Sequence, residues 1–412
     1  MTRKVVITGL GATTPIGGDV PTMWNNALKG VSGARTLEDE WVAKYELPVH
    51  FAARCSTPAL DVLSRVEAKR MDPSTQFGVI AAREAWADSG ITEVDHDRLA
   101  VAFATGIGGV WTLLDAWDTL KEKGPRRVLP MTVPMLMPNG VAAAVSLDLG
   151  ARAGAHTPVS ACASGTEALH LGLDLIRSGK ADVVMCGGAE AAIHPMPLAA
   201  FASMQALSRR NDDPQGASRP YDMGRDGFVM GEGAGALVLE AEEHALARGA
   251  RIYGELAGTS VTADAYHITA PDPQGLGATR ALKAAMFDGR IQAEDVVHVN
   301  AHATSTPVGD KPEYTALRAA LGNHIDNVAV SATKSQMGHL LGASGAVEAV
   351  LTVLAVYERK APVTINLENQ DPEIPLDVVT KTPRDLPAGD IVALSNSFGF
   401  GGHNAVIAVR SI

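Results

Sequence analysis

One cysteine of the chain has surroundings that favour nucleophilic chemistry. Cys162 lies in the run Ser160-Ala161-Cys162-Ala163-Ser164-Gly165, after an extended Thr157-Pro158-Val159 segment and before an apolar helical stretch. The thiol is therefore expected at a strand-to-helix turn, where unpaired backbone N–H groups and the helix dipole favour a thiolate. The same turn can offer an N–H to an oxyanion. An isolated cysteine is more often buried and structural, but this context favours a nucleophile.

The other two cysteines, Cys55 and Cys186, lack such surroundings. Cys186 ends an apolar strand and Cys55 has no neighbouring base, so we expect both to be structural. Three cysteines support neither a disulfide framework nor a CxxC metal site, which indicates a reducing cytoplasm.

Two later segments carry side chains that could assist Cys162. His302 follows the β-like run Val296 to Asn300 and is expected at the carboxyl end of a strand, where α/β sheets bind ligands. His298 lies within that run and is expected to be a satisfied, half-buried histidine. Lys334 and His339 share a glycine-containing loop before a helix that carries Glu348, and the three could form a charge network that tunes His339.

A third segment, Asn396 to Asn404, is a glycine-rich loop. Glycines at 399, 401 and 402 let the backbone approach a reacting carbonyl closely, while Phe398 and Phe400 supply bulk. Neither GxGxxG after the first strand nor GxxxxGK[ST] is present, so nucleotide binding is disfavoured.

Short β-branched runs alternate with longer helical stretches, which indicates an α/β fold with parallel strands joined by helices. The expected strands are Lys4–Gly9, Leu99–Thr105, Asp182–Cys186, Gly235–Glu240, Val296–Asn300, Val328–Ala332 and Asn404–Val409. The expected helices include Gln76–Ser89, Ser164–Ser178, Gly277–Phe287 and Ala343–Glu358.

Two motifs of the first half recur later in the chain. Ala163-Ser164-Gly165 is repeated as Ala343-Ser344-Gly345, and Phe228 to Gly231 resembles Phe398 to Gly401. Similar offsets predict two related halves, 1–250 and 251–412. The stretches 121–139 and 208–226 are expected to be ordered insertions that cap the core.

Composition excludes several classes of protein. With 412 residues, 46% apolar and 20% charged, the chain is neither one small module nor disordered. A net charge of −11 argues against nucleic acid or an anionic membrane as the main partner. We find no uninterrupted apolar run near the roughly 18 residues of a membrane helix, and expect a soluble protein.

Taken in chain order, the motifs resemble the β-ketoacyl-(acyl carrier protein) synthases, specifically the elongating enzymes of type II fatty acid synthesis. The resemblance covers essentially the whole chain and rests on the Cys162 turn, Asn300-Ala301-His302, Lys334 to His339, and Asn396 to Asn404. It implies a thiolase-like α/β fold, with duplicated βαβαβαββ halves in five α-β-α-β-α layers. A homodimer, an acyl carrier protein as partner and a cytoplasmic location follow from it.

The resemblance also implies roles for matching positions. Cys162 would hold the acyl chain as a thioester, and His302 and His339 would assist decarboxylation of a malonyl thioester. Lys334, paired with Glu348, would hold this network, and the N–H groups of Cys162 and Phe400 would form the oxyanion hole. The further assignments are pantetheine contacts at Thr304 and Thr306, a gate at Phe398 and Phe400, and acyl-pocket walls at Ile107 and Phe201.

Two imidazoles that stabilise the enolate make a metal or organic cofactor unnecessary. Whether a monovalent cation binds near Asn300 and Asn396 is left open. Because the carrier protein is acidic, a local basic patch is expected at Arg65, Lys69 and Arg70, or at Arg209 and Arg210. An ordinary solvated face explains either cluster equally well.

Related activities fit the residues less well. A thiolase would need a second cysteine where this chain has Gly401-Gly402-His403, and a chain-initiating synthase would have Asn in place of His339. A silent chain-length partner would lack Cys162. A ketosynthase of a specialised long-chain (mycolic-type) or polyketide pathway stays open. The chain departs from the family pattern at two positions. It has Ala303 where the family commonly has Gly, and His403 where Thr is frequent.

Overall fold

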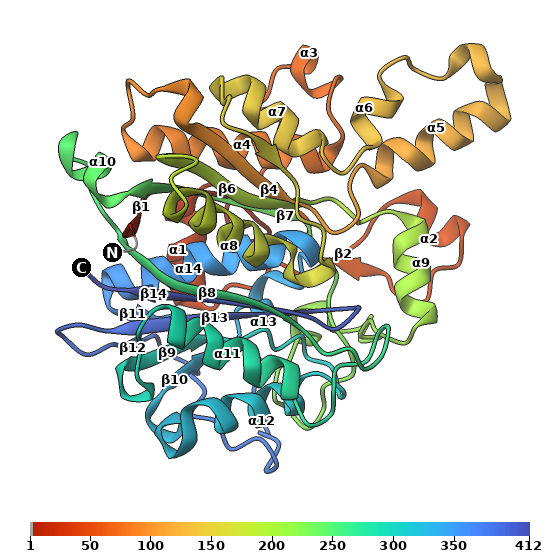
Figure 1. The fold of residues 1–412 in the computed structure, drawn as a ribbon. Coiled ribbons are helices and arrows are strands. Elements are labelled where there is room, and N and C mark those ends of the chain that lie inside the picture. The colour runs from red at the N-terminus through yellow and green to blue at the C-terminus, as the bar shows by residue number, and fades with distance from the viewer. Residues whose placement is uncertain (1–2) are drawn as a thin grey trace.

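The computed structural model describes residues 3–412, and ten of the strands in this range form one large sheet with two halves of five strands each (Figure 1). In order across the sheet, the first half consists of β5 (Ala155–His156), β4 (Leu99–Ala104), β6 (Val183–Glu190), β7 (Gly233–Ala241) and β1 (Val5–Thr13). The second half consists of β10 (Ala329–Ser331), β9 (Val296–Asn300), β13 (Val392–Gly399), β14 (His403–Arg410) and β8 (Gly254–Ala263).

The two halves have the same topology. Counted along the chain, the strands of each half are arranged in the order third, second, fourth, fifth, first. In each half the first three strands of this order pair in parallel and the others are antiparallel. The expectation of parallel strands is therefore wrong for β1, β7, β8 and β14, which pair antiparallel with their neighbours. The duplicated fold is confirmed.

Helices cover both faces of each half and produce five layers (Figure 1). The outer helices α4 (Pro73–Ser89) and α7 (Gly140–Leu149) pack on the first half, and α11 (Leu276–Asp288) packs on the second. Between the halves lie α8 (Ser164–Arg177) and α14 (Ser344–Glu358), which contact strands of both. The halves meet at a short ladder between Val6–Ile7 of β1 and Gly254–Glu255 of β8.

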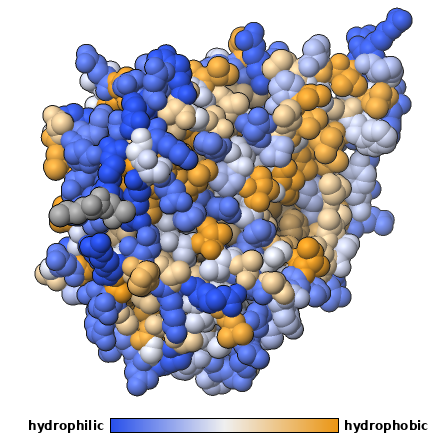
Figure 2. Space-filling model, viewed as in Figure 1, coloured by the Kyte–Doolittle hydropathy of each residue, from blue (hydrophilic) through white to orange (hydrophobic). Residues whose placement is uncertain are grey.

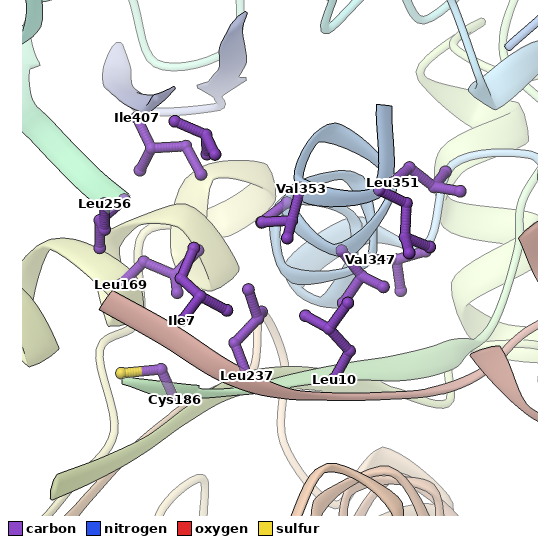
Figure 3. Close-up of a cluster of buried hydrophobic side chains, with 14 of the residues drawn as sticks. Ile7, Leu10, Leu169, Cys186, Leu237, Leu256, Val347, Leu351, Val353 and Ile407 are labelled. Atoms are coloured by element: carbon purple, nitrogen blue, oxygen red, sulfur yellow. The ribbon is translucent and has the colours of Figure 1, made fainter. Parts of the chain in front are cut away.

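The central layer explains why α14 is apolar on every side. Helices buried on all faces need apolar residues all round. The segment Leu341–Glu358 reaches the length and hydropathy of a membrane span, which sequence inspection missed because Glu348 interrupts the run. It is nevertheless 89% buried inside the protein. Figure 3 shows Val347 and Leu351 of α14 in one cluster with Leu169 of α8.

The cluster also contains Cys186, which is fully buried and in contact range of the α8 backbone at Gly172. Packing is thus the role of this cysteine, as expected. Cys55 is partly buried beside Glu232. His298 is more buried than expected, with no exposed surface. Its Nδ1 lies 2.8 Å from the Ala329 carbonyl oxygen, whereas its Nε2 has no partner in the part of the chain that the structure describes.

The remaining elements lie around this framework. They are α1 (Val20–Lys29), β2 (Arg35–Thr36), α2 (Glu40–Lys44), β3 (Phe51–Ala52), α3 (Arg65–Ala68), α5 (Val110–Lys123), α6 (Thr132–Leu136), α9 (Pro195–Ser203), α10 (Glu242–Ala247), α12 (Asp310–Leu321), α13 (Lys334–Met337), β11 (Lys360–Ala361) and β12 (Arg384–Asp385). The insertion 208–226 packs over the core as expected, with Tyr221 fully buried. The insertion 121–139 does not cap the core; with α5 and α6 it projects from the body (Figure 1).

Candidate active site

Cys162 lies at a strained turn that is repeated in the second half. A short 3-10 turn, Ala161–Ala163, leads directly into α8, and its first residue has a positive φ of 50°. The equivalent turn Leu341–Ala343 leads into α14, and Leu341 has a φ of 48°. Positive φ at a non-glycine residue is costly and persists mainly where function requires it. Gly342 occupies the position of the cysteine in the second turn, so only the first turn carries a nucleophile.

The β13–β14 hairpin approaches this turn closely. A Cβ atom at Gly399 would lie 2.6 Å from the Ser160 carbonyl oxygen and 3.0 Å from the Cys162 nitrogen, so only glycine fits. The backbone N–H groups of Phe400 and of Cys162 itself are close enough to the thiol to lower its pKa. Two N–H donors therefore lie near the sulfur, and backbone donors of this kind can also stabilise an oxyanion.

The thiol is nevertheless protonated at rest. Burial raises the pKa of Cys162 to about 12, although the charge of Lys334 and the two N–H groups lower it. The sequence argument for a resting thiolate is therefore not supported, because desolvation outweighs the donors at the turn. These donors act on negative charge only when the thiol proton leaves.

His302 is held in one orientation by buried groups. Lys334 Nζ lies 3.4 Å from His302 Nδ1 and pairs with the Glu348 carboxylate, and both side chains of this pair are almost completely buried. Because an ammonium group only donates, Nδ1 accepts and Nε2 carries the hydrogen. The Glu313 carboxylate accepts 2.8 Å hydrogen bonds from the N–H groups of His302 and Ala303, and so fixes the loop after β9.

His339 lies opposite His302. Its Nδ1 is 2.8 Å from Ser344 Oγ, the first residue of α14. The two imidazole centroids are 5.5 Å apart and their planes are nearly perpendicular. Burial and the nearby Lys334 charge hold the pKa of both histidines well below the usual value, so both are neutral. The network predicted from sequence around His339 exists, but Lys334 contacts His302.

A continuous series of aromatic rings links the hairpin to both histidines; we call it the aromatic chain. Its members are Phe398, His302, His339, Phe228, Phe201 and Phe400, with successive centroids 5.3–6.5 Å apart. It brings together Phe201, Phe398 and Phe400, which the sequence proposed for the pocket and the gate. The expected loop 396–404 is mostly hairpin strand: residues 396–399 belong to β13 and 403–404 to β14.

The other sequence candidates lie on loops and on the surface. Thr304 and Thr306 are half-buried, with hydroxyl oxygens 3.0 Å apart. Ile107 is 41% exposed on the loop after β4. Arg65, Lys69 and Arg70 are exposed at α3, on the surface.

Sequence reasoning missed three contributors to the site. Phe228 was noted only as part of a repeat, and Ser344 only as the copy of Ser164. Both belong to the site because each contacts His339, Phe228 through its ring and Ser344 through its hydroxyl group. Glu313 lies in a charged helical stretch whose pattern is that of a solvated face, and no sequence signal distinguishes it.

A group of buried oxygen atoms lies behind the histidines. Asn396 Nδ2 donates to Glu313 Oε1 at 3.0 Å, while the buried Asn396 Oδ1 and Glu348 Oε2 have no hydrogen-bond partner among residues 3–412. Amide and carboxylate oxygens of this kind suit a hard cation. Within residues 3–412, no cluster of three or more His, Cys, Asp or Glu side chains is arranged for a metal ion.

Comparison with protein families gives two matches that follow one another along the chain. Residues 2–245 match the N-terminal domain of β-ketoacyl synthases, and residues 253–368 match their C-terminal domain.

Curated proteins and solved structures agree with these matches. The chain is 48% identical to 3-oxoacyl-[acyl-carrier-protein] synthase 2 of Synechocystis over 411 residues, which is 99% of this chain and 98% of that protein. It is 47% identical to the Staphylococcus aureus protein of that name over 412 residues, with the same coverage. Among solved structures, a β-ketoacyl synthase from Burkholderia phymatum is 34% identical to this chain, with a TM-score of 0.91. A type II polyketide ketosynthase in complex with its acyl carrier protein is 31% identical, with a TM-score of 0.92. Each alignment covers 100% of this chain and 100% of the other chain.

Proposed function

Because the chain belongs to the β-ketoacyl synthase family, we propose that it is an elongating β-ketoacyl-(acyl carrier protein) synthase. It condenses malonyl-(acyl carrier protein) with an acyl chain held on Cys162, and releases carbon dioxide and a 3-ketoacyl product. One observation supports this most: a thiol between two N–H donors lies in a site with two neutral, buried histidines.

The first step transfers the acyl chain to the enzyme. The Cys162 sulfur attacks the acyl thioester carbonyl, and the carbon–sulfur bond to pantetheine breaks as the new thioester forms. The thiol proton leaves with the pantetheine sulfur, which departs as a free thiol. The N–H groups of Cys162 and Phe400 stabilise the oxyanion of the tetrahedral intermediate, an effect worth roughly 3–4 kcal/mol for one such donor.

The second step forms the carbon–carbon bond. His302 Nε2–H and the His339 ring donate to the malonyl thioester oxygen, and the bonding electrons of the departing carbon dioxide become an enolate. The enolate carbon attacks the Cys162 thioester, and the Cys162 sulfur leaves as a thiolate that takes a proton from solvent. Neutral imidazoles suit this role because they can donate without protonating the enolate carbon. The side chains alone supply this chemistry, so we propose that no organic cofactor takes part.

Sequence similarity favours fatty acid elongation over a polyketide or specialised long-chain pathway. Identity to the two 3-oxoacyl-[acyl-carrier-protein] synthases is 47–48%, against 31% to the type II polyketide ketosynthase. A silent chain-length partner is disfavoured by the complete set of Cys162, His302, His339 and Lys334.

The partner is an acyl carrier protein, whose phosphopantetheine we place along Thr304 and Thr306. Its acidic surface docks on exposed Arg65, Lys69 and Arg70. Ile107 and Phe201 form walls of the acyl pocket, and Phe398 with Phe400 gates it. A cytoplasmic location agrees with the need to keep the Cys162 thiol reduced.

We also propose that the chain works as a homodimer. Large apolar side chains are exposed along α5 and the following segment, among them Leu113, Trp117, Leu129 and Val133, each more than half exposed. Figure 2 shows apolar residues gathered on this side of the molecule. The strand β5 is an edge strand, free on one side to pair with its copy. Within each chain, we propose residues 1–250 and 251–412 as the two structural units.

An elongation assay tests the proposal. The protein is mixed with acyl-(acyl carrier protein) and malonyl-(acyl carrier protein), and the carrier-bound products are identified by mass. Formation of the 3-ketoacyl product supports the function. Release of carbon dioxide without a longer acyl chain, for any primer, contradicts it.

A further inference from the structure

Glu190, which the mechanism above does not use, is a buried carboxylate beside the active site. It is the last residue of β6 and has no exposed surface. Its carboxylate accepts hydrogen bonds from Thr105 Oγ1 at 3.0 Å and from the N–H groups of Gly106 at 2.8 Å and Ile107 at 3.2 Å. A fourth donor is the N–H of Gly342 at 3.0 Å. No Lys or Arg side chain pairs with it in residues 3–412.

These donors come from two segments that are distant in sequence. Thr105 to Ile107 follow β4 and end at the residue assigned to the acyl-pocket wall. Gly342 is the centre of the second turn, three residues after His339. Glu190 therefore joins the loop that carries Ile107 to the segment that carries His339.

The contact between the two segments leaves no spare room. A Cβ atom at Gly106 would lie 2.6 Å from Glu190 Oε2, and one at Gly342 would lie 2.1 Å from the Gly106 nitrogen. Thr105 Oγ1, which donates to Glu190, also accepts the Gly108 N–H at 3.1 Å. Glu190 thus holds three successive residues of the loop, and Gly108 is bonded to the first of them.

The burial of the Glu190 carboxylate and its four hydrogen-bond donors favour a positioning role for this residue over a general contribution to stability. Burial raises the pKa of Glu190 to about 7, while the bonds from Gly342, Gly106, Thr105 and Ile107 lower it. A buried acid is expensive unless every acceptor is used, and here each oxygen receives two donors. The Glu190 carboxylate therefore fixes the position of the loop after β4. An apolar side chain at this position could fill the same space, but it could not accept the four hydrogen bonds.

We infer that Glu190 is a positioning residue that fixes Ile107 against the second turn and thereby sets which acyl chain lengths the pocket accepts. The inference rests on the proposed function, and on Ile107 as a wall of the acyl pocket. Glu190 touches neither substrate nor the reacting atoms, and it acts through Ile107.

Glu190→Gln tests this with little change in shape. A glutamine oxygen can still accept from Gly106 and Gly342, and its NH2 group can donate to Thr105 Oγ1. The NH2 group then faces the Ile107 N–H, which loses its acceptor. We expect the ratio of kcat/KM for long against short acyl primers to change about tenfold, the size of effect expected from one lost buried hydrogen bond. Malonyl decarboxylation should persist, because His302 and His339 are untouched.

A second variant keeps the inference testable if Glu190→Gln does not fold. Thr105→Val is close in shape and removes both the bond to Glu190 and the acceptor for the Gly108 N–H, so the primer ratio should shift in the same direction. The matched control is Glu84→Gln: Glu84 is a half-buried acid on α4 that accepts from the N–H groups of Ala12 on β1 and Val20 on α1. It should lower Tm and leave the primer ratio unchanged.

The outcomes separate this inference from the proposed function. A parent protein that elongates no primer contradicts the function itself. An active parent whose Glu190→Gln and Thr105→Val forms keep the parent primer ratio overturns the role of Glu190. An equal change for all primers also overturns it, because that result would mean that Glu190 acts on Cys162 through its charge.

Discussion

Removal of the Lys334 ammonium group should damage stability and chemistry by two separable routes. In Lys334→Met, the Glu348 carboxylate remains buried with no cation beside it, since its exposed fraction is 1%. Loss of one partner of a buried ion pair costs roughly 3–5 kcal/mol. With an unfolding entropy of about 2.1 cal/mol/K per residue over 412 residues, Tm should fall by roughly 3–6 °C.

The loss of stability should increase with pH. Burial raises the pKa of Glu348 and Lys334 lowers it, so removing Lys334 raises this pKa further. The folded variant then retains a proton that the unfolded chain releases at about pH 4–5. An acid whose pKa is raised by folding stabilises the native state at low pH and loses that contribution as pH rises. Thermal unfolding between about pH 5 and pH 8 should show the difference from the parent growing.

The chemical effect has a different origin. Without the Lys334 donor, His302 can carry its proton on Nδ1, and Nε2 then accepts instead of donating to the enolate oxygen. Loss of one such donor lowers the rate of malonyl decarboxylation by about a hundredfold or more. The pKa of His302 should also rise, because Lys334 contributes to lowering it.

Two further variants make the test decisive. In Lys334→Met with Glu348→Met, no buried charge is stranded, so stability should return towards the parent while decarboxylation stays slow. Lys311→Met is the matched control, because Lys311 pairs with Glu373 on the surface and an exposed pair contributes less than about 1 kcal/mol. Parent-like stability and decarboxylation in Lys334→Met would refute the reasoning, as would recovery of activity in the double variant.

Three other outcomes follow from the site. Cys162→Ala should form no acyl-enzyme by intact mass yet keep the parent Tm, since the side chain only loses a sulfur atom; a retained acyl adduct would identify another nucleophile. His302→Ala and His339→Ala should still be acylated but should release carbon dioxide from malonyl-(acyl carrier protein) about a hundredfold more slowly, and parent-like release in either would remove that histidine from the step. Reversing the charge of Arg65 and Lys69 should raise KM for the carrier protein, most strongly at low salt; a salt-independent KM equal to that of the parent would place docking elsewhere.

Much of the fold was predictable because its signals are local and repeated. Apolar strands such as β4 and β9 and long helices such as α8 and α14 follow directly from periodicity. The strand β13 was missed because Ser395, Asn396 and Ser397 interrupt its apolar pattern, although all three are buried. Antiparallel pairing of β1 with β7 depends on partners more than 200 residues apart, which no local pattern reveals.

The site was predictable where a residue's type and position together imply chemistry, as for Cys162 and His302. Contacts made only in three dimensions were not. The neighbour of Lys334 is His302 as well as Glu348, and the Phe228 ring enters the aromatic chain from a segment that reads as core. Desolvation of the Cys162 thiol also depends on the packed hairpin, so the raised pKa could not be inferred from a helix N-terminus.

The central claim is that Cys162 carries the growing acyl chain between two carrier-protein reactions. Its most direct test is mass mapping of the protein after mixing with acyl-(acyl carrier protein), before and after addition of malonyl-(acyl carrier protein). The account predicts a mass increase located on the Cys162 peptide, which malonyl-(acyl carrier protein) then removes as a 3-ketoacyl chain on the carrier. An acyl group on another residue, or one on Cys162 that malonyl-(acyl carrier protein) does not discharge, would contradict it.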